Sequence, residues 1–211
     1  MMEKQEFLAS CEALSGFHFP RWNELPEFEL YMDQVIALAE KYLSVLTPDN
    51  KGLLTPSMIN NYVKSGVLPP PKNKKYNRTH LAMLMIICVE KTVLEISTIA
   101  DIIHKSIDAG GIESVLDQFA QMYETAIATA AKKARLAVSA SLSDDIFSFI
   151  AIENALNAGA ARTVALYAYE TVSDKTQEEP ISKEKAEKKP EKAEKKTDKS
   201  EKKTKQSSTE A

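Results

Sequence analysis

Residues 54–78 read LTPSMINNYVKSGVLPPPKNKKYNR, and they predict a short helix followed by a basic loop. Thr55 can cap the helix, Pro56 suits its first position, and Gly66 falls just past its end, where glycine is favoured. Four residues form the predicted inner face of the helix: Met58, Ile59, Tyr62 and Val63. Four others are predicted to point outward: Ser57, Asn60, Asn61 and Lys64.

Positive charge is concentrated in the same part of the chain. The net charge of the protein is −3, and residues 1–172 alone carry 15 Lys and Arg against 20 Asp and Glu. Residues 50–89 nevertheless contain no acidic residue. They contain six basic residues: Lys51, Lys64, Lys72, Lys74, Lys75 and Arg78. A positive segment on an acidic protein predicts one basic face rather than a generally basic surface.

Three further helices are predicted around this segment. The first begins after Pro26 and has an apolar face of Phe28, Tyr31, Val35, Leu38, Tyr42 and Val45. A turn cluster at 47–52 ends it. The second is capped by Thr79 and is apolar from Leu81 to Val89, which indicates a buried helix. The third is capped by Ser97, with Ile99, Ile102 and Ile103 facing inward.

The rest of the chain predicts two longer helices and a tail. The first contains Ile112, Val115, Phe119, Met122, Ala126 and Ala130 at helical spacing, and the second begins near Ser143 and continues to Tyr167. From Ser173 onward the sequence is rich in Lys and Glu and predicts disorder. The predicted fold is all-α. Its expected parts are an N-terminal segment 1–27, a DNA-binding region 28–107, a helical region 108–172 and the tail 173–211.

The order of these elements resembles the winged helix-turn-helix of MerR-type proteins. In that fold a short recognition helix ends in a glycine, a proline-bearing wing closed by a tyrosine follows, and two helices support the wing. Residues 30–35 (LYMDQV) and 58–64 (MINNYVK) resemble the signature of a bacterial family known as domain of unknown function eighteen-thirty-six. The resemblance covers roughly residues 17–107 and implies a DNA-binding fold, although the family has no assigned function. The longer loop 47–54 departs from the MerR pattern and leaves the angle between the two helices open.

The residues at these positions fit DNA chemistry. Asparagine can pair with adenine through two hydrogen bonds, and lysines along a wing suit phosphates. The candidate DNA contacts are Ser57, Asn60, Asn61, Lys64, Lys72, Lys74, Lys75 and Arg78. Two alternatives remain open, because the asparagines are also consistent with an ordinary solvated helix and the basic run with a solubilising loop. Tyr62 and Tyr76 are predicted to be packing residues.

The expected function is sequence-specific binding of double-stranded DNA in transcription regulation, by a homodimer whose C-terminal helices supply dimer contacts or a sensing surface. A small-molecule or protein effector is left open. The alternative is a helical protein–protein adaptor that does not bind DNA. If the basic residues share a face with Asn60 and Asn61, the DNA hypothesis is favoured. If they scatter, the adaptor hypothesis is favoured.

Other classes of function have little support in the sequence. His18, His80 and His104 lack a shared metal-ligand spacing, and no catalytic or phosphate-binding motif is present, so neither an enzyme nor a cofactor is expected. His80 is expected to have a structural or phosphate-binding role. Cys11 and Cys88 are predicted to be reduced core thiols, which is typical of a cytoplasmic protein. No apolar run is long enough to span a membrane.

Overall fold

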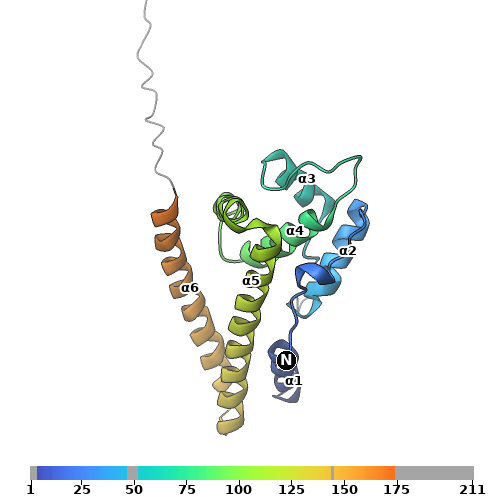
Figure 1. The fold of residues 1–211 in the computed structure, drawn as a ribbon. Helices are drawn as coiled ribbons and strands as arrows, with labels where there is room; N and C mark the ends of the chain where they lie inside the picture. The colour runs from blue at the N-terminus through green and yellow to red at the C-terminus, as the bar shows by residue number, and fades with distance from the viewer. Residues whose placement is uncertain (1–3, 47–51, 144, 174–211) are drawn as a thin grey trace, which may run out of the picture. The chain divides into compact units, whose positions relative to one another are not determined.

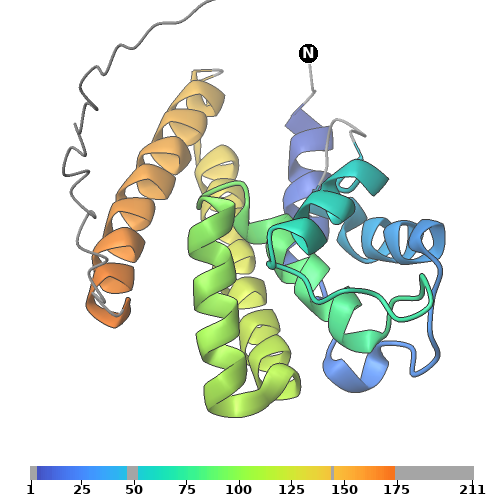
Figure 2. The ribbon, with the colours of Figure 1, turned by 90° about the horizontal axis from the view of Figure 1, so that it is seen from above.

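The computed structural model describes residues 4–46, 52–143 and 145–173, which belong to a unit comprising residues 1–174 (Figures 1 and 2). Its helices are α1 (Lys4–Ser15), η1 (Trp22–Glu24), α2 (Met32–Leu43), η2 (Ser44–Leu46), α3 (Pro56–Lys64), α4 (Arg78–Glu90), α5 (Ile96–Ala140) and α6 (Ile146–Val172). Within these described ranges the only β-structure is two isolated antiparallel bridges. The all-α prediction is therefore confirmed. The tail from 174 and most of the turn at 47–52 lie outside the described residues, and the boundaries predicted at 27 and 107 stay predictions.

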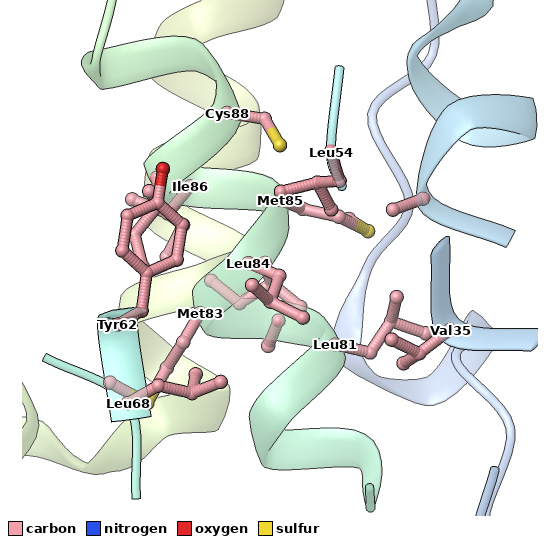
Figure 3. Close-up of a cluster of buried hydrophobic side chains, with 14 of the residues drawn as sticks. Val35, Leu54, Tyr62, Leu68, Leu81, Met83, Leu84, Met85, Ile86 and Cys88 are labelled. Atoms are coloured by element: carbon pink, nitrogen blue, oxygen red, sulfur yellow. The ribbon is translucent and has the colours of Figure 1, made fainter. Parts of the chain in front are cut away.

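Helix α4 lies at the centre of the hydrophobic core. Every residue from His80 to Cys88 is buried, so the prediction of a buried apolar helix is confirmed (Figure 3). A helix that is apolar on every face has to be covered on every face, and both α2 and α5 pack directly against it. The helix begins earlier than predicted. Asn77, rather than Thr79, is the cap, because its side chain accepts a hydrogen bond from the His80 backbone N–H.

The predicted start of the helix after Pro26 is wrong. Helix α2 begins at Met32, because Leu30 is held in a bridge by two backbone hydrogen bonds with Tyr76, each 2.8 Å long, and Tyr31 is extended. Phe28 and Tyr31 therefore lie outside the apolar face of the helix and are exposed. The Tyr31 N–H is accepted by the Gln34 side chain at 2.9 Å, which favours the later start.

Helix α5 contains the two helices predicted between residues 97 and 130, separated by a sharp turn. At Gly111 the backbone has φ +76° and ψ 155°, a conformation accessible essentially to glycine alone. In Figure 1 the part of α5 before Gly111 is seen end-on, whereas the part after it runs lengthwise. The predicted cap at Ser97 is displaced, because the helix begins at Ile96 with Glu95 at the cap position.

The N-terminal segment packs its aromatic residues against the second half of α5. Phe19 is fully buried and contacts the rings of Phe119 and Tyr123. Arg21 forms a bidentate ion pair with Glu124, with N···O distances of 2.9 and 2.6 Å. Helix α1, which the sequence analysis did not predict, also packs along α5. Residues 4–15 therefore form part of the fold.

Helix α6 is mostly exposed. Its only buried residue is Ile150, and it contacts α5. Large apolar side chains at helical spacing face solvent along it: Phe149, Ile152, Leu156, Val164 and Tyr167. No helix in the described part of the chain has both the length and the apolar character needed to cross a membrane.

The turn at Gly111 can be tested with its neighbour as a matched control. Gly111→Ala is expected to lower the free energy of unfolding by roughly 1–3 kcal/mol, because alanine is strained at this positive φ. At Gly110 an added Cβ would lie 3.8 Å from Ser114 Oγ, an ordinary contact, and φ there is not positive. Gly110→Ala is therefore expected to be neutral or stabilising by up to about 1 kcal/mol. Urea denaturation measures the free energy of unfolding of both variants. Equal effects of the two substitutions would contradict a special role of the positive φ at Gly111.

Candidate nucleic-acid interface

The outer stripe of α3 consists of the four residues predicted to point outward. Successive residues of a helix are rotated by roughly 100°, so positions 57, 60, 61 and 64 share one side. All four are exposed: Ser57, Asn60, Asn61 and Lys64. The opposite side carries Ile59 and Tyr62, which are buried. The predicted orientation of the helix is confirmed.

Local capping fixes the ends of α3 as predicted. The Thr55 hydroxyl accepts a hydrogen bond from the Met58 backbone N–H at 3.2 Å, and Pro56 occupies the first turn. At the other end Gly66 has φ +76° and donates its N–H to the Val63 carbonyl. A short helix with both ends capped holds its outer side chains in a defined register.

The inner side of α3 and the segment that follows it pack against the hydrophobic core. Tyr62 lies in the same core cluster as Ile86 and Cys88 of α4 (Figure 3). The chain after α3 folds back, because the Leu68 N–H bonds to the Tyr62 carbonyl at 3.0 Å and the Leu68 side chain is fully buried. The His104 ring donates to the Val67 carbonyl at 3.2 Å. The outer stripe of α3 is therefore supported from the opposite side by packed residues.

The predicted wing is a hairpin turn, residues 72–75. The Lys75 N–H donates to the Lys72 carbonyl at 2.9 Å, and both central residues have positive φ, 51° at Asn73 and 61° at Lys74. Two successive positive φ angles characterise the tight type I′ turn. Tyr76, buried as predicted, then pairs with Leu30 and joins the base of the hairpin to the chain before α2. In Figure 1 the loop between α3 and α4 lies at the same end of the view as α3.

Two of the predicted phosphate contacts are engaged within the protein. The Arg78 guanidinium lies 3.1 Å from a Glu27 carboxylate oxygen and 5.1 Å from the centre of the Trp22 ring. Lys75 lies 3.8 Å from a Glu29 carboxylate oxygen and also contacts the Tyr31 ring. These acidic partners fall outside residues 50–89, so the charge count over that stretch could not reveal them.

The other predicted basic residues remain accessible. Lys64, Lys72 and Lys74 are exposed, and their ammonium groups have no intramolecular partner among the described residues. The same holds for the side chains of Asn60 and Asn61. The structure therefore divides the eight predicted contacts into six accessible side chains and two that also stabilise the fold.

His80 connects the loop to the start of α4. The ring is buried, its Nε2 donates to the Pro69 carbonyl at 3.1 Å, and its Nδ1 accepts the Asn77 N–H at 3.1 Å. Burial lowers the pKa of His80, and the carbonyls of Pro69 and Pro70 partly oppose that shift. These contacts give His80 a structural role and hold the loop against the core.

Neither cysteine has the properties of a reactive thiol. Cys11 and Cys88 are both buried and unpaired, as predicted. Burial raises the pKa of Cys88 to about 11 and also raises that of Cys11. Within the part of the chain that the structure describes, no three His, Cys, Asp or Glu side chains are grouped so as to hold a metal ion.

Comparison with known proteins places the chain in a family. The model of the family described as "Domain of unknown function (DUF1836)" matches residues 20–126, just over half of the chain. The matched region contains α2 to α4, the hairpin turn and the turn at Gly111. A search of curated proteins and a search of solved structures each found no match.

The protonation of His80 is expected to lower stability in mildly acidic solution. Its pKa in the folded protein is below the ordinary value of 6.5, so the unfolded chain binds more protons in the interval beneath 6.5. The free energy of unfolding should therefore fall as the pH falls through that interval, by at most about 1.4 kcal/mol per pH unit for one proton. Denaturation at a series of pH values should show a shallower fall in His80→Gln. An identical pH dependence in the two proteins would contradict this role.

Proposed function

The chain belongs to the DUF1836 family, and we propose that it is a sequence-specific binding protein for double-stranded DNA that acts in transcription regulation. On this proposal α2 and α3 form a MerR-like helix-turn-helix, α3 enters the major groove, and the hairpin turn at 72–75 is the wing. The outer stripe of α3 reads base edges, and Lys72 and Lys74 contact phosphates.

The outer stripe of α3 carries the proposal. It presents two carboxamides and a hydroxyl side by side, from Asn60, Asn61 and Ser57, on a helix with both ends capped. Asparagine can pair with the N6 and N7 edge of adenine through two hydrogen bonds. Because the helix is held rigidly by buried residues on its other side, little conformational entropy would be lost on binding.

The conformation of Lys74 gives independent support. A type I′ turn favours Asn followed by Gly, and Asn73 satisfies the first preference. A lysine at the second position, with φ 61°, costs roughly 1–2 kcal/mol relative to glycine. A strained exposed cation at the tip of a hairpin is better explained by a contact with another molecule than by the stability of the turn.

The proposed partner in the assembly is a second copy of this chain. The large exposed apolar residues of α6 lie on one side of the helix in two groups, Phe149, Ile152 and Leu156 in its first half and Val164 and Tyr167 near its end, with Leu156 and Val164 eight positions apart. Large exposed apolar surfaces commonly mark protein interfaces. A dimer formed through α6 would present two α3 helices to two half-sites.

The alternative function is that of a helical protein–protein adaptor. The observation that favours it is the neutralisation of Arg78 by Glu27 and of Lys75 by Glu29, which lowers the positive charge beside the hairpin. An adaptor would use the same exposed surface without any dependence on phosphate charge.

A salt titration with Lys74→Gly tests phosphate contact without loss of folding. The substitution is expected to raise the melting temperature by roughly 2–4 °C, because strain at φ 61° is relieved. The slope of log K against log salt, measured on mixed genomic DNA fragments, should flatten by about 2 for a dimer. Asn73→Gly in the same turn should leave the slope unchanged. Absence of binding by the wild type at low salt would favour the adaptor.

Base reading is tested with the two asparagines. On a fragment selected for tight binding, Asn60→Ala or Asn61→Ala is expected to cost roughly 1–3 kcal/mol of binding free energy. Affinity for unrelated DNA and the salt slope should not change, since neither side chain is charged. Asn23→Ala, at an exposed position on η1, is the matched control. Equal losses on selected and unrelated DNA would argue against base contact by α3.

A further inference from the structure

A pocket of about 280 Å³ lies between α4 and the two halves of α5, away from α3 and the hairpin turn. Ile86 and Glu90 of α4, Ile103 and Ser106 before the turn at Gly111, and Gln118 and Phe119 after it contribute to its wall. Because the chain turns sharply at Gly111, residues from both halves of α5 line the same space. Met122, 65% exposed, also lines the pocket, so the pocket opens to solvent beside it.

Glu90 is the charged group of this pocket. Most of the wall is aliphatic or aromatic, and Glu90 is the only ionisable residue among those that line it. The next residue in the sequence is a lysine, but its ammonium group donates a hydrogen bond to the Leu53 carbonyl. Among the described residues the Glu90 carboxylate forms no ion pair. Burial raises the pKa of Glu90, so its charged form is left with an uncompensated loss of hydration.

We propose that this pocket binds a small lipophilic ammonium compound, with its apolar body between α4 and α5 and its cationic group on the Glu90 carboxylate. An apolar pocket with a few convergent polar groups is the usual form of a small-molecule site. Ser106 and Gln118 contribute a hydroxyl and an amide to the wall of the same pocket.

The size of the pocket limits the ligand. An apolar cavity of about 150 Å³ accommodates benzene, so in proportion this pocket holds roughly eleven non-hydrogen atoms. An arylalkyl amine such as 2-phenylethylammonium meets this limit. Its ring would lie against Ile103 and Phe119, and its ammonium group would replace the water lost by Glu90. The inference does not depend on DNA binding, because it concerns a different surface.

The test compares 2-phenylethylammonium with the neutral 2-phenylethanol, of nearly the same shape, by calorimetry. The wild type is expected to bind the ammonium compound at least about tenfold more tightly, since a hydrogen bond between two charged groups is stronger than one between a hydroxyl and a carboxylate. Glu90→Gln, which keeps the shape of the side chain, should bind the two compounds equally. Glu95→Gln, at the exposed glutamate in the N-cap position of α5, should retain the wild-type preference.

Either of two results with the wild type would overturn the proposal. One is the absence of saturable binding of 2-phenylethylammonium by the wild type at millimolar concentrations. The other is equal affinity of the wild type for the amine and the alcohol. This comparison does not depend on whether Glu90→Gln folds. As a second variant, Ser106→Leu narrows the pocket and should weaken the binding of both compounds. Unchanged affinities in that variant would also contradict the assignment.

Discussion

The burial of α4 is the constraint on which the other elements depend. Its residues from His80 to Cys88 lack a polar face, so α4 is unstable in water unless neighbouring helices cover it from all sides. Helix α2, the first half of α5 and the Tyr62 face of α3 provide this cover. Each of these elements therefore has one side committed to the core. For α3, which is short, the commitment of Ile59 and Tyr62 leaves a single polar stripe for contact with other molecules.

A second important interaction joins the N-terminal segment to the second half of α5 through Glu124. The carboxylate of Glu124 accepts hydrogen bonds from the Phe19 N–H and the Arg21 guanidinium, which lowers the pKa of Glu124 and raises that of Arg21. These residues stand at the two limits of the region matched by the family model, 20–126. The matched region thus begins and ends at a bidentate ion pair that holds α5 against the N-terminal segment. Helices α1 and α6 are additions to the outside of this unit.

The outcome of the sequence analysis depended on the range of the interactions involved. The caps of α3, at Thr55 and Gly66, were predicted correctly because capping joins residues three or four positions apart. Helix α1 was not predicted, although Phe7, Cys11 and Leu14 have helical spacing. The start of α2 was wrong because the Leu30–Tyr76 bridge joins residues far apart in sequence. The ion pairs of Arg78 and Lys75 were not predicted for the same reason, because their partners Glu27 and Glu29 lie far from them in sequence.

This distribution of charge bears on how DNA would be bound. The ion pairs of Arg78 and Lys75 fix the hairpin to the chain before α2, so these two cations orient the turn and contribute less to phosphate attraction. Three accessible lysines per protomer remain, namely Lys64, Lys72 and Lys74. On a body whose residues 1–172 carry net negative charge, so few phosphate contacts would give one protomer only weak affinity for DNA. The DNA proposal therefore requires two copies, and the exposed apolar side of α6 is the described surface best suited to join them.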